Sequence, residues 1–227
     1  MNTRIRNTVF SLIINTVLVA TAAAQMAGAN LTPMPAGPMD QVTAAPGVSF
    51  GQYHQVLVAP VKMSYQHGWF DTVSSYKAAP DFGRVMTQAQ ADKILKDLSA
   101  AFDRLVPEEF ARRGYNIATA PGPGVLLLEP TVSQLWISNP FNDQPDRVAV
   151  TQDSGTATFE VAMKDSQTGA QVGYSRVRMR TMLTAPRFTK SSDVFVSADW
   201  EDTFKHWAQL QAGRMDSLKG QTVAARQ

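Results

Sequence analysis

Two alternating runs of apolar and polar residues, together spanning positions 155–183, form the clearest pattern in the chain. One side of the first run is apolar and the other is mainly polar, and the apolar side consists of Ala157, Phe159, Val161 and Met163. Turn-forming residues at 165–169 (DSQTG) separate the two runs. Alternation on both sides of such a turn predicts a β-hairpin within a sheet that has one buried face.

The apolar set changes phase in the second run, from Val172 and Tyr174 to Val177 and Met179. A one-residue slip in a strand moves every following side chain to the other face, so this change predicts a β-bulge near Ser175. The shift also aligns three arginines on the face opposite the apolar set, namely Arg176, Arg178 and Arg180.

Two interpretations of this arginine stripe are open. Arginines in a row can bind an acidic partner or an anionic ligand. They can equally pair with Glu160 and its neighbours across the strands of an exposed sheet face. Because such cross-strand pairs are common, the sequence favours the second interpretation, in which the stripe belongs to the scaffold.

Two segments carry apolar residues at helical spacing. The first begins at a capping box at 87–90 (TQAQ), and Pro107 is expected to end or kink it, with a possible further turn before Gly114. The second is expected to begin at Asp199 as its N-cap and to end at Gly220. Its buried stripe contains Trp200, Phe204, Trp207, Ala208, Gln211, Met215 and Leu218.

Further apolar runs at 53–63 and 125–137 predict strands that are interrupted at Pro60 and Pro130. In the resulting order of strand, helix, strand, hairpin and helix, the second strand is expected to lie parallel to the first. We therefore expect an α+β two-layer sandwich. It would have a mixed or antiparallel sheet of about four to five strands with two helices on one face.

The first 24 residues have the pattern of a secretory signal peptide, with Arg4 and Arg6 before an apolar run at 9–20. Cleavage is expected after Ala24, or failing that after Ala29. Residues 25–51 are rich in Pro, Ala and Gly and show no period, which predicts a linker. A single α+β domain at 52–220 and a disordered tail at 221–227 complete the expected organisation.

Charge and cysteine content support export and exclude some functions. Lys and Arg number 21 against 19 Asp and Glu, and without Arg4 and Arg6 the mature chain is neutral, so we expect no nucleic-acid partner. The chain of 227 residues has no cysteine, which excludes disulfides, thiolate metal sites and lipid attachment to cysteine. These features predict a periplasmic or outer-membrane-associated protein, with membrane contact only through a partner or an uncleaved leader.

No motif in the sequence indicates catalysis, a cofactor or a metal. Residues 47–51 (GVSFG) match G-x-S-x-G, but a proline-rich stretch precedes the serine and a strand follows it, so we regard the match as chance. A hydrolase is the least favoured hypothesis, and it would need His54, His67 or His206 to meet a Ser or Asp in space.

The segment at 64–86 is rich in aromatic residues, including Trp69 and Phe70. Such a loop can be a surface for a partner or ligand, which makes these two residues candidate binding residues together with the arginines. Loop aromatics more often fold back onto the core, and this alternative stays open.

Four stretches of the chain resemble an uncharacterised family of bacterial envelope lipoproteins, domain of unknown function 3313. They are 53–61 (YHQVLVAPV), 121–128 (PGPGVLLL), 164–169 (KDSQTG) and 200–218 (WEDTFKHWAQLQAGRMDSL). The resemblance implies a signal peptide and an envelope address, and it supplies no catalytic residues. The chain departs from the family in lacking the lipid-bearing cysteine that usually follows the signal.

The function that these features predict is that of a non-enzymatic binding or structural subunit of an envelope assembly, with an envelope protein as partner. It would use the open sheet face or the aromatic loop. The alternative is a carrier or sensor of a small amphiphile held between sheet and helices, with the arginines at its head group.

Overall fold

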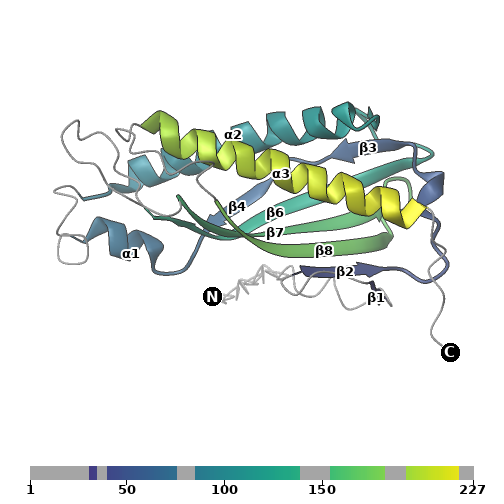
Figure 1. Ribbon diagram of the computed structural model, residues 1–227, viewed down its shortest axis with the longest axis horizontal. Coiled ribbons are helices and arrows are strands. Elements are labelled where there is room, and N and C mark those ends of the chain that lie inside the picture. The colour runs from purple at the N-terminus through teal and green to yellow at the C-terminus, as the bar shows by residue number, and fades with distance from the viewer. Residues whose placement is uncertain (1–30, 35–39, 76–84, 139–153, 182–192, 220–227) are drawn as a thin grey trace, which may run out of the picture.

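The computed structural model describes residues 31–34, 40–75, 85–138, 154–181 and 193–219. Within these ranges eight strands form one mixed sheet, accompanied by three α-helices and a short 3-10 helix, η2 (Figure 1). In chain order the elements are β1 (Thr32–Met34), β2 (Asp40–Ala44), η2 (Phe50–Gln52), β3 (Gln55–Val58), β4 (Lys62–Tyr65), α1 (Trp69–Ser74), α2 (Gln88–Arg112), β5 (Asn116–Ile117), β6 (Val125–Ile137), β7 (Gly155–Asp165), β8 (Gln171–Arg180) and α3 (Asp193–Lys219). The predicted signal peptide at 1–24 and tail at 221–227 lie outside the described residues.

The strand order across the sheet is β1-β2-β8-β7-β6-β3-β5, and β4 also pairs with β6. The predicted hairpin is confirmed, since β7 and β8 pair antiparallel around the turn. Asp165 stabilises this turn by accepting hydrogen bonds from the backbone amides of Gln167 (3.1 Å) and Thr168 (2.9 Å). The predicted parallel pairing is also confirmed, because β3 runs parallel to β6.

The bulge in the hairpin lies closer to the turn than the sequence predicts. Met163 pairs with Gly173 and Lys164 pairs with Gln171, so Val172 is the extra residue and the ladder is regular through Ser175. From Gly173 onward the register is unbroken up to Arg180, which pairs with Thr156. Tyr174 therefore lies on the same face as the arginines. The prediction that it belongs to the apolar set of the second strand was wrong.

The capping box of α2 is confirmed at Thr87, whose side chain accepts from the Gln90 amide while Gln90 reaches back to the Thr87 amide. Pro107 does not end this helix, which runs through it to Arg112. The last helix begins earlier than predicted, because α3 already includes Asp193. Asp199 consequently lies inside α3, where its carboxylate accepts a hydrogen bond from Ser154 Oγ instead of capping the helix.

Aromatic side chains form the contact between the sheet and the two long helices. The ring of Phe159 on β7 packs against Phe204 (6.1 Å between centroids) and Trp207 (5.8 Å) of α3. Phe102 of α2 contacts the same two rings, each at 5.2 Å. All four side chains are almost completely buried, so this cluster joins α2, α3 and the sheet in one core.

The segment at 25–51 is not a simple linker, because it supplies two strands and η2 to the fold. Strand β2 pairs antiparallel with β8, and β1 pairs with β2 at the edge of the sheet. Ala44 and Phe50 of this segment are buried in the core. The prediction failed because the partner of β2 lies far away in the sequence, where local composition carries no signal of the pairing.

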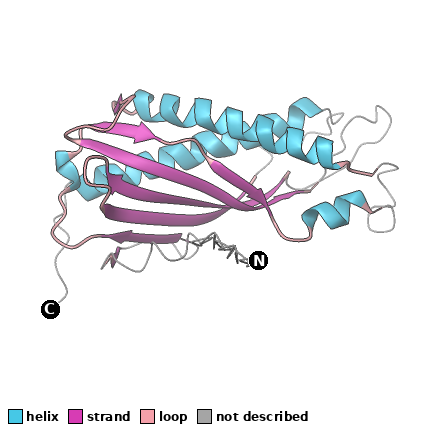
Figure 2. Ribbon diagram, turned by 180° about the vertical axis from the view of Figure 1, so that it is seen from behind, coloured by secondary structure: helices cyan, strands magenta, loops and turns pink. Residues whose placement is uncertain are grey.

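The predicted α+β class with a mixed sheet is confirmed, but four to five strands and two helices were too few. The two long helices run side by side in both views, whereas α1 lies at one end of the molecule, apart from them (Figures 1 and 2). The expected arrangement of two helices on one face therefore does not describe the whole fold. Within the described ranges, no helix has an apolar stretch long enough to cross a membrane.

Candidate functional site

Trp69, which was predicted as a binding residue, is part of the core. It is the first residue of α1 and is fully buried. Its indole Nε1 donates a hydrogen bond to the Ile137 carbonyl oxygen (3.0 Å), and its ring stacks on Tyr65 with centroids 4.0 Å apart. Phe70 is half-buried against the same core. At its described positions the aromatic segment thus follows the alternative in which its side chains fold back onto the core, and Trp69 offers no surface to a partner. Residues 76–84 of the segment lie outside the described residues.

The arginines lie on the face of the sheet that is opposite the aromatic core. In the β7–β8 ladder Arg176 faces Glu160, Arg178 faces Thr158 and Arg180 faces Thr156. These positions alternate with Phe159, whose ring contacts α3. All three arginines are exposed. The cross-strand register therefore directs the arginine stripe away from α3.

Arg176 is paired within the sheet, as the scaffold interpretation predicts. Its Nε lies 3.4 Å from Glu160 Oε1, and the hydroxyl of Tyr174 donates to the same oxygen at 2.6 Å. Burial, followed by the hydrogen bond to Glu160, raises the pKa of Tyr174 well above its ordinary value. The hydrogen bond from this hydroxyl holds the Glu160 carboxylate against Arg176.

Arg178 has a different environment from Arg176. It lines an open pocket of about 390 Å³, which we call the arginine groove, formed by Gln41, Gln134, Thr158, Arg176 and Arg178. None of the residues that the structure describes offers a carboxylate to Arg178. Arg180 does not line the groove. In the arginine groove, a charged side chain thus meets an accessible depression of the sheet face.

A β-bulge in β6 shapes one wall of the groove. Ser133 pairs with Thr158 and Trp136 with Thr156, so the two residues between them on β6 oppose a single residue on β7. Gln134 accommodates the bulge in a left-handed conformation with φ of 52°, which is uncommon for a residue other than glycine. Its Oε1 accepts a hydrogen bond from Thr158 Oγ1 (3.3 Å).

Gln41 and Gln134 were not identified from the sequence as site residues. Gln41 lay within the presumed linker, and its position in the groove follows from the pairing of β2 with β8 opposite Arg176. Gln134 left a weak signal, since the apolar residues around it are spaced three apart from Val132 to Leu135 and two apart from Leu135 to Ile137. Such a break in alternation is typical of a bulge.

The structure places the candidate catalytic residues on separate elements. His54 precedes β3, His67 precedes α1 and His206 belongs to α3, and all three are exposed. Ser49 of the GVSFG stretch immediately precedes η2, a single 3-10 turn, rather than the helix that a nucleophile elbow requires. In the described part of the chain, no group of three or more His, Cys, Asp or Glu residues is arranged to hold a metal ion.

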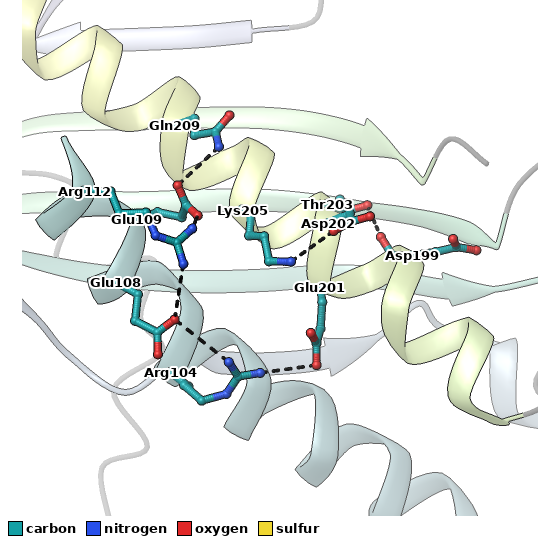
Figure 3. A network of polar contacts seen from close by, with 10 residues as sticks. All are labelled: Arg104, Glu108, Glu109, Arg112, Asp199, Glu201, Asp202, Thr203, Lys205 and Gln209. Atoms are coloured by element: carbon teal, nitrogen blue, oxygen red, sulfur yellow. Dashed lines mark hydrogen bonds and ion pairs between the residues drawn. The ribbon is translucent and has the colours of Figure 1, made fainter. Parts of the chain in front are cut away.

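A second set of polar contacts links α2 to α3 (Figure 3). Glu109 is buried and accepts from Gln209 Nε2 at 3.2 Å and from Arg112. Arg104 lies 3.3 Å from Glu201 of α3 and 4.0 Å from Glu108. Arg104 and Glu109 thus bond across to α3, and the remaining ion pairs of the network lie within one helix. The network stabilises the helix contact and presents no open cation comparable to Arg178 among the residues drawn.

The fold and the site define a mixed-sheet α+β protein with one face packed by aromatic residues and one face that bears a polar groove. The chain belongs to the family described as protein of unknown function (DUF3313), whose model matches residues 30–210. The resemblance found in the sequence is thereby confirmed. No curated protein matches the sequence.

Solved structures with similarity to the chain have low sequence identity and low TM-scores. A PelC dodecamer from Paraburkholderia phytofirmans is 11% identical, covering 82% of this chain and 98% of that chain, with a TM-score of 0.37. Protein XCC0632 from Xanthomonas campestris, assigned to DUF330, is 15% identical over 83% of this chain and 95% of that chain, with a TM-score of 0.40. At these scores neither structure informs the function of this chain.

Proposed function

We propose that the protein is exported and serves as a non-enzymatic binding or structural subunit of a periplasmic or outer-membrane assembly. The observation that carries the proposal is the arginine groove on the exposed face of the sheet. The leader pattern at 1–24 and the absence of cysteine support the cell-envelope address. The near-neutral charge of the chain favours a protein partner over nucleic acid.

The geometry speaks against a carrier that holds an amphiphile between sheet and helices with the arginines at its head group. Phe159, Phe204 and Trp207 are packed together in that interlayer. The arginine side chains of β8 project from the opposite face. One ligand cannot place its tail in the interlayer and its head group at the arginines without passing through the sheet.

The proposal can be tested in bacterial cells by fractionation combined with site-specific photo-crosslinking. Mass spectrometry of the N-terminus should show cleavage after Ala24 or Ala29. A photo-crosslinking residue at Gln41, in the groove, should trap an envelope protein, whereas the same residue at Lys96, exposed on α2, should not. A chain that stays unprocessed in the cytoplasm, or that forms no adduct from Gln41, contradicts the proposal.

A further inference from the structure

Among the described residues that line the arginine groove, the charges leave one positive charge for an external group. The carboxylate of Glu160 lies against Arg176 and is held there by Tyr174. These two opposite charges balance each other, while Arg178 lines the same groove and forms no ion pair with any of the described residues. A site with one uncompensated guanidinium is complementary to a group that carries a single negative charge.

The lining of the groove indicates what kind of molecule brings that charge. Small-molecule sites are concave, mostly apolar, and bury most of the ligand. The arginine groove is open, and every side chain that lines it is polar: two amides, one hydroxyl and two guanidinium groups. This composition suits a charged side chain presented by a macromolecule better than a drug-sized molecule enclosed by the protein.

We infer that the arginine groove docks a carboxylate of an acidic segment in a partner protein, with Arg178 as its ligand and the Gln41 and Gln134 amides beside it. The planar guanidinium of arginine matches the two oxygens of a carboxylate. A phosphate dianion fits less well, because its second charge would be unbalanced beside Glu160. The inference rests on the proposed function and specifies its partner chemistry.

The test is a titration of the purified protein at low salt with an acetylated, amide-capped tetra-glutamate peptide, followed by NMR shifts and calorimetry. The matching tetra-glutamine peptide and inorganic phosphate are the comparison probes. The glutamate peptide should bind most tightly and should shift the signals of Gln41 and Gln134. Binding should weaken as salt is added, because the attraction is electrostatic.

Substitutions separate the role of Arg178 from a general charge effect. Arg178→Gln should weaken binding of the glutamate peptide about tenfold, as expected for loss of a charged hydrogen-bonding partner. Arg178→Lys should bind the glutamate peptide with an affinity between those of the wild type and Arg178→Gln. Lysine keeps the positive charge but lacks the planar guanidinium that can donate two hydrogen bonds to one carboxylate. Arg104→Gln, which removes the same charge from α2, should leave binding unchanged. Thermal unfolding of each variant verifies that it is folded.

Glu160→Gln provides a test in the opposite direction. It removes the carboxylate that balances Arg176, so it should tighten binding of the glutamate peptide several-fold. Equal binding of the glutamine peptide, preference for phosphate, or no effect of Arg178→Gln would overturn the inference. These outcomes are distinct from failure of the proposed function, because an envelope adduct formed from Gln41 in cells can persist when the peptide results are negative.

Discussion

Arg214 on α3 forms an ion pair with Asp40 on β2, joining residues 174 positions apart in the chain. The two side chains are only 13% and 18% exposed. Arg214 also donates to Ser175 Oγ on β8 at 2.7 Å. The guanidinium thus connects the last helix to two neighbouring strands, one of which belongs to the segment whose composition resembles a linker.

Replacing Asp40 with Asn should destabilise the protein by about 2 kcal/mol, less than for a fully buried pair because both partners retain some contact with water. The loss arises because Arg214 would stay largely buried without its anion. Urea unfolding measures the change, and hydrogen exchange should be faster at the β2 amides than in the rest of the sheet.

The matched control for Asp40 is Asp97→Asn on α2, since the Lys93–Asp97 pair is 75% and 59% exposed. This variant should cost less than about 0.5 kcal/mol, as exposed pairs usually do. Equal effects of the two substitutions would show that the ion pair does not fasten β2 to α3.

Replacing Trp69 with Ala should destabilise the fold by about 3–5 kcal/mol, because a fully buried indole leaves a large cavity. Trp69→Phe should cost less, about 1–2 kcal/mol, mainly through the unsatisfied Ile137 carbonyl. Phe70→Ala should have a smaller effect than Trp69→Ala, since Phe70 is only half-buried. Urea unfolding of the three variants should reproduce this order, and a larger effect at Phe70 would contradict the assigned burial.

Stability should depend on pH at the β7–β8 turn. The amide and hydroxyl of Thr168, with smaller contributions from Tyr53 and Gln167, hold the pKa of Asp165 below its ordinary value of 3.8. The carboxylate therefore stabilises the folded state fully above that value, and the contribution is lost as the pH falls through the lower folded-state pKa.

Asp165→Asn should consequently unfold at lower urea concentration than the wild type at neutral pH, with the difference vanishing in strong acid. Thr168→Val removes the hydroxyl donor and should raise the pKa of Asp165, which an NMR titration of the carboxyl carbon measures. A wild-type pKa at or above 3.8 would contradict this account of the turn.

Gly155 should tolerate no side chain. It has φ of 147°, and a Cβ there would lie 2.0 Å from the Trp136 carbonyl oxygen and 3.0 Å from Trp200 Cζ2. Gly155→Ala should destabilise the fold by about 3 kcal/mol, because neither the backbone of the bulge nor the buried indole can yield easily. Gly213→Ala is the control, since nothing lies within 4 Å of its Cβ and alanine favours a helix by about 0.5–1 kcal/mol. The midpoint temperature of thermal unfolding should fall for Gly155→Ala and rise for Gly213→Ala.

Local patterns predicted the elements that depend on neighbouring residues. The turn at Asp165 and the capping box at Thr87 are made by side chains that bond to backbone groups within three residues, so both were found from the sequence. The bulge was detected as a phase change but was placed at Ser175 instead of Val172. The error came from Tyr174, which counts as apolar by composition although its hydroxyl bonds to Glu160 on the polar face.

The candidate site depended on long-range pairing and could be predicted only in part. Alternation identified Arg176 and Arg178 as sharing a face, but their different environments come from the cross-strand register. Gln41 reaches the groove only because β2 adds to β8. Gln41 was missed as a site residue, whereas Trp69 was predicted as a binding residue and is buried in the core. An aromatic residue in an irregular stretch has the same sequence signal whether it faces solvent or the core.

The sequence by itself determined the hairpin, the start of α2, the polar face that carries the arginines and membership of the family, since each follows from short-range periodicity or matched segments. The tertiary structure alone decided that the segment before η2 extends the sheet, that Trp69 is buried, and that Arg176 is paired within the sheet while Arg178 faces a groove. These outcomes depend on which distant strands meet and in what register, and that is set by the sum of packing and hydrogen bonding over the whole chain.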